Sequence, residues 1–117
     1  MPKTVLVVDD SSMMRKIIIK LLQPAGYEIV GEAASGAESI KLYQTLRPDV
    51  VTMDITMRDM DGIAAASEIK TFDPEAKILF MSNLEGDKYR DEVERVGGLG
   101  MVNKHDNKAL EILAALD

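Results

Sequence analysis

The sequence contains no cysteine and no tryptophan, and its only aromatic rings besides one histidine are two Phe and three Tyr. Without cysteine, disulfides, zinc–thiolate sites and thiol catalysis are excluded. One histidine, His105, cannot form a histidine metal cluster and offers no evident His-centred catalytic triad. With so few rings the core must be aliphatic, and the eight Met residues are expected to help fill it.

Positive charge and long apolar runs are also scarce. The 14 Lys and Arg residues stand against 20 Asp and Glu, which gives a formal net charge of −6. Such a chain suits neither nucleic acid nor an anionic membrane, because phosphates are bound by Lys and Arg. No apolar run is long enough to span a bilayer, and Met1-Pro2-Lys3 leads directly into a predicted strand without a signal peptide. We therefore expect a cytoplasmic protein without membrane insertion.

The composition that is present fits one globular domain. The chain has 117 residues, with 46% hydrophobic and 29% charged residues, which is a folded rather than a disordered balance. We find no linker, low-complexity tract or change of composition along it. Residues 1–117 are therefore predicted to form a single domain.

Five apolar segments alternate with five helical patterns. Three segments are continuously apolar and predict strands buried on both faces, at Thr4 to Val8, Asp49 to Met53 and Lys77 to Met81. The other two, Tyr27 to Ala33 and Leu99 to Asn103, are more polar or shorter and fit the edges of a sheet. This pattern predicts an α/β fold: a doubly wound five-stranded parallel sheet with right-handed crossovers and the strand order 2-1-3-4-5.

Two of the predicted helices bear on function. The first, after residues 9–12, carries two apolar rows at helical spacing and is expected to bury both. The fourth, Asp87 to Val96, has a thin apolar stripe, so it is predicted to be loosely held and is a candidate moving part. The rows of the first helix are Met13, Ile17 and Leu21, and Met14, Ile18 and Leu22; the stripe of the fourth is Tyr89, Val93 and Val96.

Polar side chains follow the predicted strands at the points where they end. Asp9 and Asp10 follow the first strand, Asp54 the third, Ser82 the fourth and Lys104 the fifth. The carboxyl ends of parallel strands share one edge of the sheet, and ligands bind where the first and third strands lie side by side. Each residue alone could be a helix cap, a loop acid or a surface lysine. The set indicates one site.

The chemistry of this set points to a metal ion and to phosphate. Three carboxylates packed together repel one another, so cations must accompany them. Lys104 supplies one positive charge, and an all-oxygen site without His or Cys suits Mg²⁺ or Mn²⁺ for the rest. A hard cation, a lysine, a hydroxyl and a nucleophilic carboxylate together make a phosphoryl-transfer arrangement.

These residues resemble the response-regulator receiver domains, and closely the stand-alone chemotaxis type, which has the flavodoxin-like and CheY-like (βα)5 fold. The resemblance covers the whole chain. It rests on the segments Val7-Val8-Asp9-Asp10-Ser11 with Arg15, Met53-Asp54 followed by Met57, Met60-Asp61-Gly62, Met81-Ser82 and Val102-Asn103-Lys104.

The resemblance implies a phosphorylation-dependent signalling switch of a two-component system rather than an enzyme, although it would assist its own phosphoryl transfer and dephosphorylation. The cofactor would be Mg²⁺ and the phosphodonor a sensor histidine kinase. The implied roles are Asp54 as phosphoacceptor, Asp10, Asp54 and the backbone carbonyl of Thr56 as direct metal ligands, Asp9 as a ligand mainly through water, and Ser82 and Lys104 as partners of the phosphoryl group.

The resemblance also implies how the signal leaves the domain. Phosphorylation would draw Ser82 inward and shift the fourth strand, fourth helix and fifth strand, because a local charge change biases an element with two arrangements. We detect no effector segment, so the chain is expected to act as a monomer that docks on a downstream target protein.

Several positions depart from the family pattern. Arg58 stands where the family usually has Pro and brings a cation to the site, and His105 replaces the Pro that usually follows the lysine. Met101 occupies the place of a switching Tyr or Phe, so rotation of an aromatic ring cannot be the readout. Asn83 replaces a small residue and is expected to crowd the phosphoryl pocket. Leu84 can neither orient nor activate water, which predicts slow loss of the phosphoryl group and faster loss in Leu84→Glu.

Three other functions compete with the switch. A receiver that no longer takes phosphate would act only as an interaction module, and Arg58 and His105 keep this alternative open. A flavodoxin-type electron carrier needs a phosphate-binding loop after the first strand, where Asp9-Asp10 would repel the flavin phosphate, and purified protein would be coloured. A phosphatase with an aspartyl nucleophile usually has two acids one residue apart and a longer chain with a cap.

Overall fold

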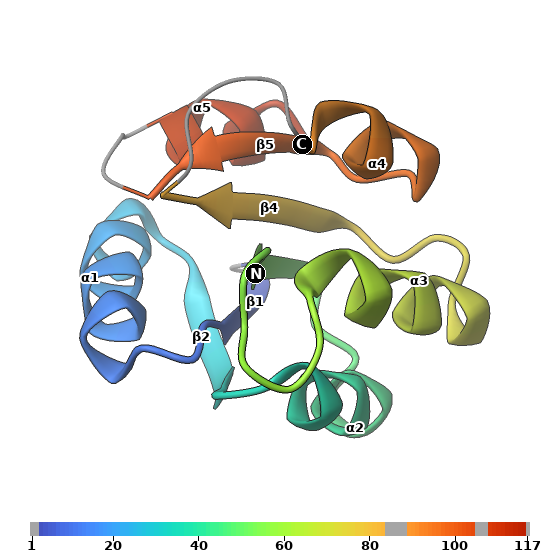
Figure 1. Cartoon of the computed structure of the whole chain (residues 1–117). Helices are drawn as coiled ribbons and strands as arrows, with labels where there is room; N and C mark the ends of the chain where they lie inside the picture. The colour runs from blue at the N-terminus through green and yellow to red at the C-terminus, as the bar shows by residue number, and fades with distance from the viewer. Residues whose placement is uncertain (1–2, 84–88, 105–107, 117) are drawn as a thin grey trace.

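The computed structural model describes residues 3–83, 89–104 and 108–116. The chain forms one five-stranded parallel sheet in the order β2-β1-β3-β4-β5 (Figure 1), as the sequence predicts. The elements are β1 (Thr4–Val8), α1 (Ser12–Leu22), η1 (Gln23–Ala25), β2 (Glu28–Ala33), α2 (Gly36–Leu46), β3 (Val50–Asp54), α3 (Gly62–Phe72), β4 (Ile78–Ser82), α4 (Arg90–Arg95), β5 (Gly100–Asn103) and α5 (Lys108–Ala114).

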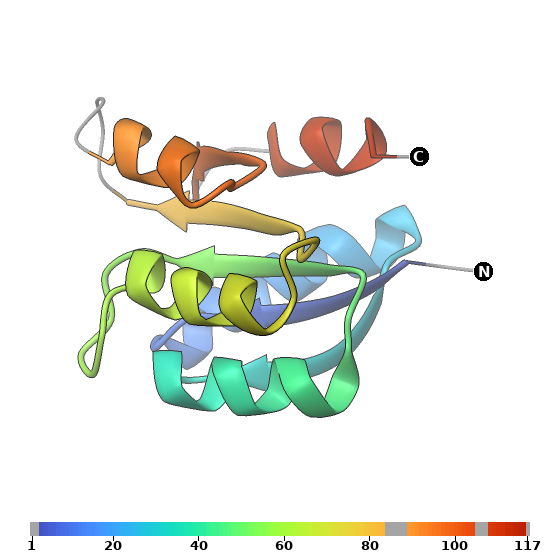
Figure 2. The same ribbon diagram turned by 90° about the vertical axis from the view of Figure 1, so that its right-hand side faces the viewer.

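The helices form two layers, with the sheet between them. Helices α1 and α5 cover one face and α2, α3 and α4 cover the other (Figures 1 and 2). Ile18 and Leu113 belong to the core under the first layer, and Tyr43, Ile69 and Val93 to the core under the second. Every residue of β3 and β4 is buried, whereas β2 and β5 at the sheet edges are only partly covered. The buried centre therefore holds the strand ends that carry the candidate site.

Polar caps fix where the helices next to the site begin. The Ser11 side chain accepts a hydrogen bond from the Met14 N–H at 3.2 Å, and the Asp61 carboxylate accepts one from the Ala64 N–H at 2.7 Å. Each cap satisfies a backbone donor that the first turn of a helix leaves unpaired. Because α1 and α3 start directly after the loops that carry the acids, these caps also fix those loops.

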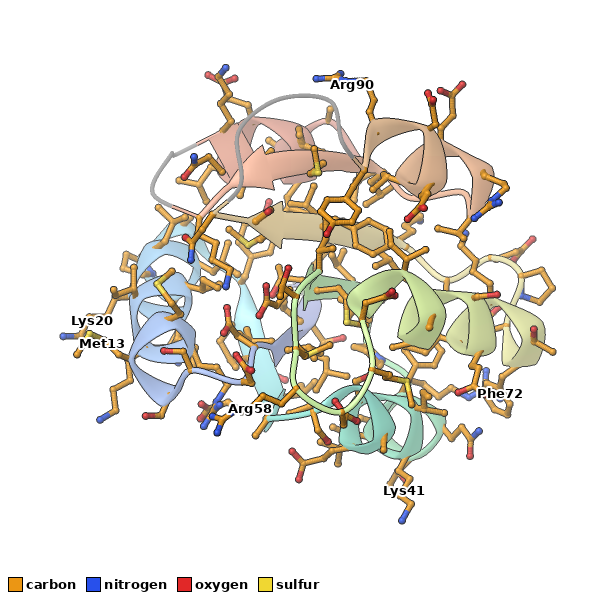
Figure 3. All side chains as sticks on the ribbon, in the orientation of Figure 1. Met13, Lys20, Lys41, Arg58, Phe72 and Arg90 are labelled. Carbon is orange, nitrogen blue, oxygen red and sulfur yellow. The ribbon has the colours of Figure 1, made fainter. Side chains whose placement is uncertain are left out.

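Helix α1 buries less than the sequence predicts. Ile18 and Leu22 are buried, but Met13 is 70% exposed and Ile17 is 44% exposed. Figure 3 shows Met13 on the outer side of the helix, away from the sheet. The expectation that both apolar rows are buried was therefore wrong. A helix lying on one face of a sheet buries a single stripe, and Met13 and Ile17 lie outside that stripe, while Leu21 at the end of the same row packs partly against the core.

The helices differ in length, and α4 is shorter within the described residues than the predicted Asp87 to Val96. Helices α1, α2 and α3 have 11 residues each, while α5 has seven and α4 has six. Val93 is the buried residue of α4, and Tyr89 and Val96 pack only partly against the core, which confirms its thin stripe. The predicted first residues of that helix lie outside the described residues. Within the described part of the chain, no helix is long and apolar enough to cross a membrane.

Candidate functional site

The parallel register brings the predicted site residues to one edge of the sheet. Met53 pairs with Val8, and Asp54 pairs with Met81, so β1, β3 and β4 end side by side. Ser82 pairs with Asn103, which places Lys104 at the same edge. The ends of these strands surround a cavity of about 350 Å³. Its lining residues are Asp9, Asp10, Ser11, Met14, Asp54, Thr56, Ser82, Asn83 and Lys104. The six residues predicted for the site all line this cavity.

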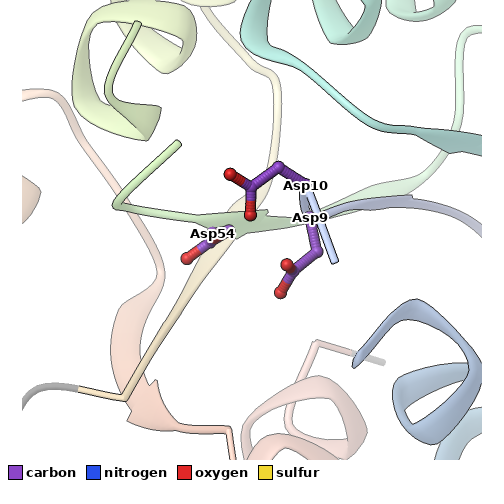
Figure 4. Close-up of side chains that lie close together, drawn as sticks. All are labelled: Asp9, Asp10 and Asp54. Carbon is purple, nitrogen blue, oxygen red and sulfur yellow. The ribbon is translucent and has the colours of Figure 1, made fainter. Parts of the chain in front are cut away.

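Three carboxylates and one ammonium group form the centre of the cavity. One carboxylate oxygen from each of Asp9, Asp10 and Asp54 lies within 4.8 Å of the others (Figure 4). Lys104 Nζ lies 2.7 Å from Asp9 Oδ2 and 3.0 Å from Asp54 Oδ1. Asp9, Asp54 and Lys104 are buried, and Asp10 is partly exposed at the mouth. The deep part of the cluster is thus an acid pair held by one lysine.

Burial and mutual repulsion shift the ionisation of this cluster. Burial raises the pKa of Asp54 from 3.8 to about 6; the ion pair with Lys104 opposes this shift, and the charges of Asp9 and Asp10 add to it. Burial alone would lower the pKa of Lys104, but its contacts with Asp9 and Asp54 outweigh burial and raise it. Lys104 therefore stays charged, while one positive charge does not fully stabilise two buried carboxylates.

The donors in the cavity fit a divalent cation. Oδ2 of Asp54 is buried and has no hydrogen-bond partner among the described residues. A buried carboxylate oxygen in that state is costly unless a cation or donor reaches it. The neighbouring groups are carboxylates and Thr56, which lines the same cavity. Such oxygen donors suit Mg²⁺ or Mn²⁺ better than a soft metal.

The loop after β3 is tightly anchored at its end. The Gly62 N–H donates to the Ile55 carbonyl at 2.7 Å, which closes the loop on itself. A Cβ at position 62 would fall on the carbonyl oxygen of Asp54, so only glycine allows this close approach. Met57 in the middle of the loop is buried. The backbone of Asp54 is therefore held from both the strand and the helix that follows.

Two contacts that support the site could not be predicted from local sequence. The Asp59 carboxylate accepts hydrogen bonds from the Gly36 and Ala37 N–H groups, each at 3.0 Å, and so ties the loop to the start of α2. Arg15 donates to the Asp9 carbonyl at 2.7 Å and pairs with a glutamate of β2. Asp59 lies 23 residues from Gly36, and no spacing rule links a loop acid to the start of a distant helix.

The described residues that depart from the family pattern lie at different distances from the cavity. Arg58 Nε lies 3.6 Å from Asp10 Oδ2, so this residue does bring a cation to the site. Asn83 is exposed and lines the wall of the cavity. Met101 is partly buried against the core under α4, in a strand without an aromatic ring at that position. His105 and Leu84 lie outside the described residues.

A larger cleft of about 670 Å³ lies between α3 and α4. Its lining mixes both charge signs, with Asp61 and Glu92 beside Lys70 and Arg95. It lacks the clustered acids and the buried lysine of the smaller cavity. We place the chemistry in the smaller cavity because its charged groups are buried and converge.

The chain also matches a known family. A family model for the response regulator receiver domain matches residues 5–117. Chemotaxis protein CheY of Thermotoga maritima is 50% identical over 82 residues, or 70% of this chain and 68% of that protein. Protein CcdB of Bacillus subtilis is 42% identical over 112 residues, covering 94% of this chain and 93% of that protein.

The fold comparison agrees. A chain in the crystal structure of the CheX–CheY–BeF3–Mg complex from Borrelia burgdorferi superposes with a TM-score of 0.93 at 32% identity, covering 99% of this chain and 90% of that chain. The acid cluster is compatible with the Mg²⁺ that receiver domains bind. The chain belongs to the response regulator receiver domain family, is homologous to CheY, and is consistent with a phosphorylation-dependent signalling switch.

Proposed function

We propose that residues 1–117 act as one receiver domain in which Asp54 takes a phosphoryl group from a histidine kinase. The observation that carries this proposal is the buried Asp54 carboxylate. Its Oδ1 lies 3.0 Å from Lys104 Nζ, and its Oδ2 has no hydrogen-bond partner among the described residues. A carboxylate held in place with an unused lone pair is suited to act as a nucleophile.

The transfer itself needs little chemistry from the protein. An oxygen of Asp54 attacks the phosphorus of a phosphohistidine, and an oxygen–phosphorus bond forms as the nitrogen–phosphorus bond breaks. The imidazole leaves with the bonding electron pair. Lys104, already beside Asp54, would offset charge on the phosphoryl oxygens, and the Ser82 hydroxyl, which lines the same cavity, would donate to one of them.

Asp10, Asp54 and the backbone carbonyl of Thr56 are the groups that we propose hold Mg²⁺, with Asp9 acting mainly through water. When bound, Mg²⁺ would offset negative charge on the transferring phosphoryl group. The chain's own residues supply the remainder: Arg15 and Lys104 fix Asp9, while the Gly62 turn fixes Asp54. Slow hydrolysis of the phosphorylated domain, the result expected from Leu84, remains part of this proposal.

We further propose a cytoplasmic monomer that receives its signal from a kinase and passes it to a target protein by docking. The solved complex of CheY with CheX supports a protein target, since that relative binds a protein in its BeF3–Mg form. The net charge of −6 makes nucleic acid and membrane unsuitable partners.

Mass spectrometry after incubation with acetyl phosphate and Mg²⁺ tests this function. We expect a gain of one phosphoryl group in the wild type and in Asp91→Asn, which removes an exposed acid of α4 as a matched control. Asp54→Asn and the wild type in EDTA should show no gain. A wild-type protein without any gain would favour the phosphate-independent interaction module, and a coloured, flavin-containing preparation would favour the electron carrier.

A further inference from the structure

Two basic side chains, Lys104 and Arg58, form ion pairs with the three clustered acids. Lys104 Nζ lies 2.7 Å from Asp9 and 3.0 Å from Asp54, and it is buried with them. Asp10 stands apart from this buried pair. Its Oδ2 lies 3.6 Å from Arg58 Nε at the mouth of the cavity. Each carboxylate of the cluster therefore has a cationic side chain of the protein within 4 Å.

The backbone of Arg58 is anchored by its neighbours, whereas its side chain is exposed and contacts the site only through Asp10 in the part of the chain that the structure describes. Its neighbour Met57 is buried in the core, and its other neighbour Asp59 is bound to the start of α2 through two hydrogen bonds of 3.0 Å. The Arg58 side chain is 88% exposed and projects from this loop (Figure 3). The guanidinium can therefore leave Asp10 without movement of the loop, while the anchored backbone holds the base of the side chain beside the cavity.

We propose that Arg58 is a built-in counterion that pairs with Asp10 in the metal-free protein and is displaced when a divalent cation binds there. The inference rests on the proposed function, because that function makes Asp10 a metal ligand. A divalent cation and a guanidinium repel each other, so both cannot contact one carboxylate at full strength. The tethered arginine therefore lowers the affinity for metal and moves into solvent on metal binding.

The expected size of the effect follows from the exposure of Arg58. An exposed ion pair stabilises little, and it is partly screened by water and salt. Displacing such a pair should weaken metal binding by about two- to fivefold, and not by orders of magnitude. The effect should require a cation at position 58 itself, since a charge elsewhere on the surface does not contact Asp10.

Calorimetric titration with Mg²⁺ alone tests the proposal in four proteins: wild type, Arg58→Gln, Arg58→Lys and Lys16→Gln. Lys16→Gln removes the same charge from the exposed side of α1 and is the matched control. We expect Arg58→Gln to bind about two- to fivefold more tightly, with Lys16→Gln close to wild type and Arg58→Lys closer to wild type than Arg58→Gln.

A second readout uses the unchanged protein. The Nε–H signal of Arg58, followed by NMR, should shift with the same Mg²⁺ midpoint as calorimetry. Three results would each contradict competition between Arg58 and Mg²⁺ for Asp10. They are an unchanged Mg²⁺ affinity in Arg58→Gln, an equal gain of affinity in Lys16→Gln, and an Arg58 Nε–H signal that does not shift when Mg²⁺ is added. Wild type and all variants failing to bind Mg²⁺ would instead overturn the proposed function on which the inference rests.

Discussion

Helices α3 and α4 cover the same face of the sheet, on either side of β4, but they are held very differently. Helix α3 has 11 residues and buries Gly62, Ile63, Ala65, Ala66 and Ile69. Helix α4 has six residues and buries Val93. Buried apolar area is what stabilises a packed helix, so α4 should open at a much lower free energy than α3. We therefore expect α3 to stay in place and α4 to be the helix that moves.

The proposed phosphoacceptor Asp54 lies on the well-packed side, and Ser82 and Lys104 lie on the side nearer α4. Asp54 ends a fully buried strand, and its loop leads into α3 through Gly62. Ser82 and Lys104 stand at the ends of β4 and β5, the strands nearest α4. A phosphoryl group on Asp54 that draws Ser82 inward, as the family resemblance implies, would therefore pull on α4, the less packed of the two helices.

The largest expected effect is a loss of stability when a buried side chain of α3 is removed. Ile69→Ala removes a side chain that is 1% exposed, and we expect it to lower the free energy of unfolding by about 2–4 kcal/mol. Urea unfolding followed by circular dichroism measures this change. Glu68→Ala, an exposed neighbour on the same helix, is the control and should change stability by less than about 0.5 kcal/mol. Equal losses in the two variants would remove the packing argument.

The ionised carboxylate of Asp54, on the well-packed side of the site, is destabilised by its burial. The pKa of Asp54 is raised to about 6, so the folded protein binds this proton more tightly than the unfolded chain does. The ionised carboxylate therefore destabilises the fold above about pH 6, and this penalty disappears as the pH falls below about 4. In EDTA at pH 7, Asp54→Asn should be more stable than wild type by about 1–3 kcal/mol.

Thermal unfolding of both proteins across this pH range checks the sign of the effect. The stability difference should shrink between pH 7 and pH 4.5, where wild-type Asp54 takes up its proton. A difference that grows towards acid pH would show that the carboxylate is stabilised by its surroundings, against the raised pKa. Asp91→Asn, an exposed acid of α4, is the control and should show little change over the range.

On the weakly packed side, Val93→Ala should have a smaller and more local effect. Removing two methyl groups from the buried residue of α4 is expected to cost about 1–2 kcal/mol. Native-state hydrogen exchange should show faster exchange in α4, with α3 little changed. Equal acceleration in both helices would mean that α3 and α4 open as one unit and not separately.

The smallest effect concerns the C-terminal end of α3. The Tyr43 hydroxyl donates to Asp73 Oδ2 at 2.8 Å, and Asp73 is the C-cap residue that follows the last residue of α3, Phe72. Tyr43→Phe keeps the buried ring and removes this bond, which should lower stability by about 0.5–1.5 kcal/mol. Urea unfolding measures it, with Tyr27→Phe as a control. A loss near that of Ile69→Ala would mean that the ring itself had shifted.

The sequence alone predicts the sheet and the site because both depend on local and repeating patterns. Apolar runs such as Val50 to Met53 require burial on both faces, and strand–helix alternation leaves few topologies. That topology brings strand ends together, so the sequence predicts Asp9, Asp54 and Lys104 at one edge of the sheet. The structure confirms this arrangement with ion pairs of 2.7 and 3.0 Å.

Tertiary structure alone decided the contacts between elements that no spacing rule connects. The exposure of Met13 and Ile17 depends on which stripe of α1 faces the sheet, and both rows have the same helical period. The capping of α2 by Asp59 and the pairing of Arg58 with Asp10 join residues 22 to 48 positions apart. Such contacts arise from the packing of loops after the elements have formed, so periodicity and propensity carry no information about them.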